Sequence, residues 1–293
     1  MNTSPGPPVI FDARRRATRL ARSERLFSGA DFLHDRAAEN AVNSLEVILR
    51  DFPDVVDLSA HAGPFGRRLT DSVAASRVGA VKTVADPGTR AAPGAQPLPL
   101  PDQSQDLIVS LMSLHWANDL PGALAKIRRA LKPDGLFMGT LLGAGTLKEL
   151  RGVLTQAELE VRGGAQARVS PFADGFDGAA LLQRAGFALP VSDVDRVVVR
   201  YSDMLALVRD LRAMGETNVL AGLSRPLTRA IVTRAAALYA EAHAGPDSRV
   251  PATFEIVHLA GWAPHESQQK PLPRGSAKVR LADALGVKEQ TGE

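Results

Sequence analysis

The chain has 293 residues, of which 45% are hydrophobic and 23% charged, with a formal net charge of +3. This composition is ordinary for a globular protein of one large or two modest domains, and so small a net charge predicts no nucleic-acid partner. The sequence contains no cysteine, which excludes disulfides, thiolate catalysis and Cys-ligated metal sites.

Secretory signals and membrane spans are also missing from the pattern. No apolar run is long enough to cross a bilayer, and no secretory signal with a charged start and an apolar centre is found. We therefore predict a cytoplasmic protein without a transmembrane segment.

Residues 1–30 are predicted to form a basic N-terminal extension. Its basic residues are Arg14, Arg15, Arg16, Arg19, Arg22 and Arg25. An arginine-rich start is compatible with an organelle transit peptide, with a surface for an acidic partner, or with a solvated helix face. We favour the solvated helix face.

Residues 31–202 are predicted to form an α/β core. A helix is expected over 31–50, followed by a short strand at 55–58 and a second strand at 81–85 that ends at Asp86. Residues 86–102 are too rich in proline and glycine for an ordinary crossover helix.

The clearest local pattern lies in residues 106–142. An apolar run over 106–112 predicts a strand covered on both faces, Asp119 can cap the following helix, and residues 133–135 are expected to turn the chain into a second buried strand at 136–142. Such a unit is a right-handed crossover between parallel strands, which predicts a parallel sheet.

The rest of the chain alternates helices and strands. Helices are expected over 146–161 and 179–185, and a strand over 196–201. Two further helices predict a helical cap insertion at 203–244, before a last strand at 253–262 and a polar tail within 245–293.

Polar and aromatic side chains follow the first strand and the strand at 106–112. Ligands of open parallel sheets bind outside the carboxyl ends of the strands, so the loop at 59–66 and the segment 113–119 are candidate pocket walls. His115 and Trp116 can hydrogen-bond or stack on a ligand, although strand-end aromatics are also often core residues.

The motifs identify no catalytic residue and no metal site. His61, His115, His258 and His265 are too scattered along the chain to predict metal ligands, and no carboxylates pair at a spacing typical of acid–base catalysis. Two polar blocks, at 214–218 and 261–271, are interpreted either as substrate-facing edges or as solvated segments.

Several strings of residues, in order along nearly the whole chain, carry a family resemblance. They are Ser113–Pro121, Leu131–Phe137, Gly145–Arg151, Leu182–Phe187, Met214–Asn218, Pro251–Phe254, His265–Gln268 and Gly275–Lys278. On these residues the chain resembles the Rossmann-like S-adenosylmethionine-dependent methyltransferases, and within them the assembly-factor-five group of respiratory complex I with its bacterial relatives.

The resemblance implies a mostly parallel, seven-stranded sheet with a reversed last strand and a helical insertion before it. It also implies an S-adenosylmethionine site and a protein substrate, possibly a complex I subunit, that is hydroxylated or methylated on arginine. By position, the cofactor residues are Asp57, Ser59, Ala60, His61, Gly63, Asp86, Gln96, Pro97, Leu98, Ser113, Leu114 and His115. The predicted substrate or partner residues are Trp116, Glu216, Asn218, His265, Glu266 and Gln268.

Three departures from the family pattern fall on the cofactor site. Ser59 replaces a glycine, Ala95 and Gln96 replace an acidic pair, and the segment between Asp86 and Pro97 is short. A side chain at Ser59 is expected to crowd a ligand. Two alternatives therefore stand beside the enzyme hypothesis: a non-catalytic scaffold that has lost the cofactor, and a carboxyl methyltransferase for small molecules or acyl carriers.

Overall fold

The computed structural model describes residues 9–84, 99–172, 177–222 and 225–269. They form a six-stranded sheet in the order β2-β1-β3-β4-β6-β5. The strands are β1 (Val55–Asp57), β2 (Val81–Thr83), β3 (Gln105–Ser110), β4 (Leu131–Leu142), β5 (Ala188–Tyr201) and β6 (Val250–Trp262).

The sheet is parallel from β2 to β4, and the last strand is reversed. β6 runs antiparallel to both β4 and β5. This confirms the α/β class and the mostly parallel sheet. The described residues give six strands where the resemblance implies seven, and β2 has no neighbour among them on its outer side.

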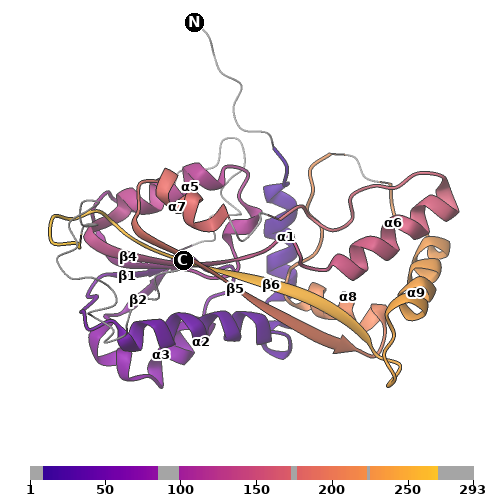
Figure 1. Cartoon of the computed structure of the whole chain (residues 1–293), viewed down its shortest axis with the longest axis horizontal. Helices are drawn as coiled ribbons and strands as arrows, with labels where there is room; N and C mark the ends of the chain where they lie inside the picture. Colours follow the sequence, from indigo (N-terminus) through magenta and orange to yellow (C-terminus); the bar gives the residue numbers. More distant parts are fainter. Residues whose placement is uncertain (1–8, 85–98, 173–176, 223–224, 270–293) are drawn as a thin grey trace, which may run out of the picture.

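Helices cover both faces of the parallel part (Figure 1). α5 (Leu120–Ala130) and α7 (Gly178–Arg184) lie on one face, and α2 (Phe32–Val47) and α3 (Pro64–Thr70) on the other. Every residue of β3 is buried, as its continuous apolar run predicts. The buried residues of α2 recur at helical spacing as Leu33, Ala37, Ala41 and Leu45.

β4 and β5 begin well before the sequence pattern predicts. β4 begins at Leu131, and residues 133–135 lie within a register shift of the strand rather than in a turn before it. β5 begins at Ala188 and includes Pro190 next to a second register shift. An edge strand tolerates proline because the missing N–H is not needed by a second neighbour.

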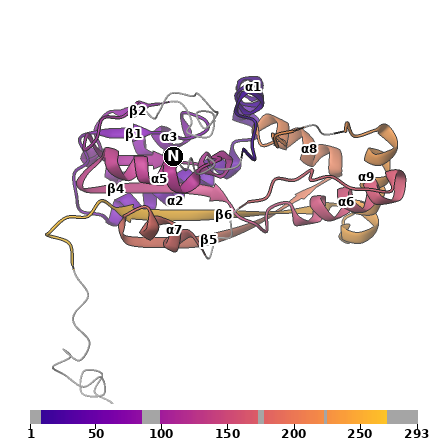
Figure 2. The same ribbon diagram turned by 90° about the horizontal axis from the view of Figure 1, so that it is seen from above.

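The outer ends of β5 and β6 carry a second group of helices (Figures 1 and 2). This group comprises α6 (Lys148–Arg162), α8 (Met204–Ala213) and α9 (Arg229–His243), and α1 (Ala13–Ser23) contacts α8. Their buried apolar residues, among them Leu207 and Ile231, belong to the same core cluster as those of α2. No helix in the described ranges is both long and apolar enough to span a membrane.

Short 3₁₀ turns complete the described elements. They are η1 (Phe27–Gly29), η2 (Val73–Arg77) and η3 (Leu114–Trp116). η3 follows shortly after β3, so the first part of the predicted pocket wall at 113–119 is a tight turn whose residues are buried.

Candidate functional site

The carboxyl ends of β1 and β3 meet, as the sequence predicts. Val56 of β1 is in register with Ile108 of β3. Beyond the strands, the Leu58 N–H donates to the Val109 carbonyl at 2.7 Å and the Ala60 N–H donates to the Leu111 carbonyl at 3.1 Å. The two loops that follow these strands therefore lie side by side.

Ser59 ties these two loops together. The Asp57 carboxylate accepts a hydrogen bond from the Ser59 N–H at 2.8 Å, and the Ser59 Oγ accepts one from the Leu111 N–H at 2.9 Å. Burial raises the pKa of Asp57, and its hydrogen bonds with Ser59 oppose that rise. The Ser59 hydroxyl thus satisfies a buried backbone donor that a glycine would leave unpaired.

His61 points away from the sheet and into the N-terminal region. Its ring stacks on Phe27 with centroids 3.7 Å apart. Its Nε2 lies 3.0 Å from the Met214 carbonyl oxygen and 3.4 Å from the Ser23 Oγ. His61 therefore joins the loop after β1 to α1 and to the segment after α8.

The same loop keeps a face of small residues. Ala62 and Gly63 are exposed and Ala60 is half-buried, whereas Ser59 and His61 are buried. Gly63 has φ +113°, a conformation that L side chains rarely adopt. Because the side chains of Ser59 and His61 are buried, the exposed part of this loop carries only the small residues Ala62 and Gly63.

His34 of α2 lies beneath this loop, against Phe27 and His61. Neither ring nitrogen has a hydrogen-bond partner among the described residues. Burial, with a smaller contribution from the neighbouring His61, lowers the pKa of His34 to about 3. His34 is therefore neutral at physiological pH.

A second buried cluster lies beside η3 and is centred on Glu216. The Glu216 carboxylate accepts hydrogen bonds from His115 Nε2 at 2.9 Å and from Trp116 Nε1 at 3.0 Å. It also forms an ion pair with Arg16 of α1 at 3.1 Å. The Arg16 guanidinium donates to the Gly215 carbonyl at 2.7 Å and sits 5.0 Å from the centroid of the Trp116 ring.

The charges in this cluster compensate each other. Burial would raise the pKa of Glu216, but the charges of Arg16 and His115 lower it to about 2, so the carboxylate is ionised. The Arg16 side chain is 0% exposed. The interpretation of the N-terminal arginines as a solvated helix face is therefore wrong for Arg16, because its partner is contributed by a segment 200 residues away.

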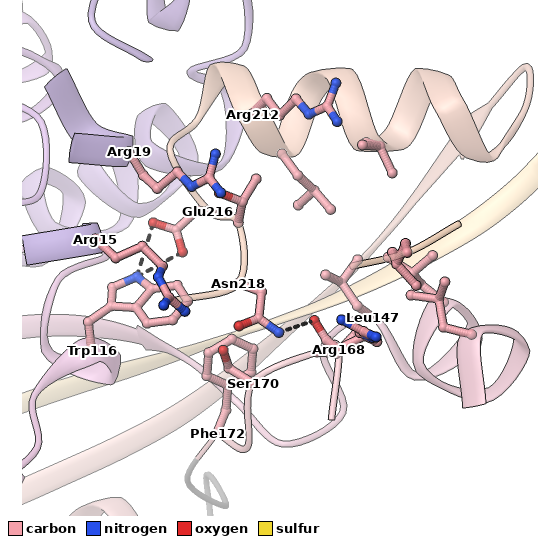
Figure 3. Close-up of a pocket in the computed structure, with 17 residues that line it drawn as sticks. Arg15, Arg19, Trp116, Leu147, Arg168, Ser170, Phe172, Arg212, Glu216 and Asn218 are labelled. Carbon is pink, nitrogen blue, oxygen red and sulfur yellow. Dashed lines mark hydrogen bonds between the residues drawn. The ribbon is translucent and has the colours of Figure 1, made fainter. Parts of the chain in front are cut away.

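A cavity of about 380 Å³ adjoins this cluster (Figure 3). It lies among α1, α6 and α8 and the segments around 168–172 and 216–218, and Trp116, Glu216 and Asn218 form part of its wall. The Asn218 amide donates to the Arg168 carbonyl at 2.9 Å, which holds the two segments together.

The predicted site residues separate into four groups. His115, Trp116, Glu216 and Asn218 lie together around the Glu216 cluster, next to the loop that contains Ser59 and His61. Ser113 and Leu114 are buried at the start of η3. Asp86, Gln96, Pro97 and Leu98 lie outside the described residues.

The fourth group is far from the Glu216 cluster. Gln268 donates to Asp134 at 2.9 Å, near the amino end of β4, and His265 bonds to Ser267. His265, Glu266 and Gln268 therefore lie at the end of the sheet opposite to the strand tips that carry the candidate site.

The sequence analysis missed two buried polar residues. Arg16 and His34 are central to the buried clusters, yet each lies on a helix whose pattern gives no signal for a buried polar partner.

In the ranges that the structure describes, no group of three or more His, Cys, Asp or Glu is arranged to hold a metal ion.

Comparisons with known proteins agree with this architecture. The family described as "Methyltransferase domain" matches residues 66–139. The chain is 37% identical over 285 residues to "Arginine-hydroxylase NDUFAF5, mitochondrial" of Danio rerio. The aligned region covers 94% of this chain and 89% of that protein. The corresponding Homo sapiens protein is 35% identical, covering 96% and 85%.

A more partial match has a different name. "Malonyl-[acyl-carrier protein] O-methyltransferase" of Halorhodospira halophila is 37% identical over 194 residues, covering 66% of this chain and 63% of that protein. The similarity to the NDUFAF5 proteins extends over almost the whole chain, and this protein belongs to the NDUFAF5 family of methyltransferase-fold proteins.

Proposed function

We propose that this protein binds S-adenosylmethionine at the tips of β1 and β3 and modifies a protein partner, on arginine, in respiratory complex I biogenesis. The observation that carries the proposal is the pairing of the two strand tips, with the exposed residues Ala62 and Gly63 in the loop after β1. The names of the full-length relatives support arginine as the target. A cytoplasmic location is part of the same proposal.

Each part of the site has a distinct role in this proposal. The loop from Asp57 to Gly63 binds the cofactor through its backbone, and Ser113, Leu114 and His115 face the reactive end. A bound S-adenosylmethionine supplies an electrophilic methyl group, and the protein mainly holds the acceptor in line with it. This explains why no acid–base pair is needed.

Calorimetry of the full-length chain with S-adenosylmethionine and S-adenosylhomocysteine tests the cofactor site. We expect saturable binding that Asp57→Asn weakens, while Asp71→Asn, an exposed carboxylate at the end of α3, leaves it unchanged. Absence of binding at millimolar ligand contradicts the enzymatic proposal.

Mass spectrometry of a complex I subunit from a deletion strain, with and without the gene restored, identifies the modification. Gain of one oxygen on an arginine indicates hydroxylation, and gain of a methyl group indicates methylation. If the deletion strain loses neither the hydroxyl nor the methyl modification, both forms of the proposal are contradicted.

A non-catalytic scaffold is the second candidate, favoured by Ser59 and His61 at the loop. Both side chains are engaged in internal contacts that would hold the loop without a ligand. Rescue of the deletion strain by an Asp57→Ala, Asp86→Ala variant supports the scaffold. Failure of rescue by a stably folded variant contradicts it.

The carboxyl methyltransferase named among the partial relatives is the third candidate. Complementation of a biotin-requiring strain tests it directly.

A further inference from the structure

The cavity beside Glu216 combines an apolar wall with a positively charged rim. Part of its apolar lining comes from α6 and α8. These residues are Leu150 and Leu154 of α6, Leu147 just before α6, and Val208 and Leu211 of α8. Its charged residues are Arg15, Arg19, Arg168, Arg212 and the single acid Glu216. Figure 3 shows Arg15 and Arg19 near Glu216, and Arg212 on α8 above the cavity.

Three of the nearby arginines already have acidic partners. Arg16 pairs with Glu216, Arg168 with Glu158 at 2.5 Å, and Arg15 with Asp12 at 3.7 Å. The Arg15 guanidinium also donates to the Leu220 carbonyl at 2.7 Å. Their charges are therefore compensated within the protein.

Arg19 and Arg212 differ from these three. Within the described ranges, neither side chain forms an ion pair with an acid, although both line the cavity. Arg19 is half-buried and Arg212 is exposed at the rim. The cavity thus keeps two uncompensated positive charges next to apolar surface.

We propose that this cavity binds an apolar chain that ends in a carboxylate. The apolar chain packs on Leu150, Leu154 and Leu211, and the carboxylate accepts hydrogen bonds from Arg19 and Arg212. A guanidinium or ammonium group at the same place would meet these two arginines and no free acid, because Glu216 is fully engaged by Arg16, His115 and Trp116.

The position of the cavity connects this ligand to the candidate site. Trp116 and Glu216 separate the cavity from His115, so a bound ligand lies next to the predicted reactive end. The inference goes beyond the proposed function, because it assigns this cavity a second ligand that is distinct from the modified arginine. Its test measures binding without cofactor, so its failure and the failure of the proposed function are separate results.

Four probes on the full-length chain separate charge from chain length: octanoate, butanoate, 1-octanol and octylguanidinium. Calorimetry reports binding, as does tryptophan fluorescence in a Trp262→Phe background, where Trp116 is the remaining tryptophan. We expect octanoate to bind at least about tenfold more tightly than either 1-octanol or octylguanidinium, because only octanoate can accept charge-assisted hydrogen bonds. Butanoate, which buries less apolar surface, is expected to bind at least about tenfold more weakly than octanoate.

Matched arginine variants locate the carboxylate. We expect the double variant Arg19→Gln, Arg212→Gln to weaken octanoate binding at least about tenfold. The control is Arg22→Gln, Arg209→Gln, which changes exposed arginines on the same two helices that do not line the cavity. This control is expected to bind octanoate like the unchanged protein.

Four results overturn the proposal: no saturable binding of octanoate, equal or tighter binding of octylguanidinium, no dependence on chain length, or equal losses in the cavity and control variants. The substituted arginines are exposed or half-buried, so thermal unfolding of both double variants confirms that loss of binding is not loss of fold.

Discussion

Two buried histidines reach the same segment from neighbouring strand tips, but they are held there by different forces. His61, after β1, stacks on Phe27 and contacts the Met214 carbonyl, which are neutral groups. His115, after β3, bonds to the ionised Glu216, which also pairs with Arg16. The loop after β1 is therefore fixed by packing and backbone hydrogen bonds, and the turn after β3 by buried charge.

The loop after β1 and the turn after β3, the two halves of the candidate site, are therefore expected to lose different amounts of stability on substitution. Removing a neutral contact costs the contact and some packing, whereas removing one member of a buried ion pair leaves an uncompensated charge in a medium that solvates it poorly. Segment 214–216 receives both kinds of contact. Substitution of Glu216, its charged residue, is therefore expected to destabilise the protein most.

Glu216→Ala tests the charged half most directly. We expect it to lower the free energy of unfolding by about 3–5 kcal/mol, because it removes the carboxylate from a buried ion pair. Glu216→Gln keeps the shape and some hydrogen bonds and should cost less. Urea unfolding measures both.

Glu241→Ala is the matched control, since Glu241 is an exposed acid on α9 that pairs with Arg234. A loss in Glu216→Ala no greater than in this control would mean that the buried ion pair does not stabilise the turn after β3.

The same comparison shows what the sequence could predict. The continuous apolar run of β3 and the following helix predict the parallel unit and its position beside β1, because these features depend on local pattern and on the handedness of the crossover. The candidate strand tips were therefore found without coordinates.

The buried ion pair could not be found in this way. Arg16 is one of several arginines on α1, and its burial depends on how α1 packs against the segment after α8. Pairing over 200 residues is set by tertiary structure, and no periodicity of α1 distinguishes Arg16 from Arg15 or Arg19. The glycine-to-serine departure at Ser59 was visible, but its bond to the Leu111 N–H required the geometry of both loops.

His34→Leu tests the neutral half through its pH dependence. The folded-state pKa of about 3 lies below the ordinary value of 6.5. As the pH falls below 6.5 the unfolded chain gains a proton at His34 that the folded protein does not, so stability decreases on acidification. The effect is bounded by about 1.4 kcal/mol per pH unit.

We therefore expect the free energy of unfolding of His34→Leu to fall less steeply than that of the unchanged protein between pH 6.5 and 4.5. This window lies above the range in which Glu216 contributes, because the lowered pKa of Glu216 removes stability only below about 4.5. His265→Gln, at an exposed histidine, should leave the slope unchanged, and parallel slopes in all three proteins would refute the neutral burial of His34.

His61→Ala removes the neutral bridge between the loop and α1. Loss of the stacking on Phe27 and of the bond to the Met214 carbonyl is expected to cost about 1–3 kcal/mol, less than Glu216→Ala. Equilibrium unfolding in urea gives this value, and an equal or larger loss than in Glu216→Ala would reverse the ranking of the two halves.

Arg36→Gln should have the smallest effect and sets the scale for a charge pair outside the core. Arg36 of α2 donates to both carboxylate oxygens of Asp195 on β5, but its side chain is 51% exposed. Water and salt screen such a pair, so we expect a loss below about 1 kcal/mol that decreases further at high salt. Urea unfolding at low and high salt measures it. Arg36 and Arg16 each form an ion pair with a carboxylate, but only the pair of Arg16 is fully buried. An equally large loss in Arg36→Gln and Glu216→Ala would therefore show that burial is not what makes the Glu216 cluster strong.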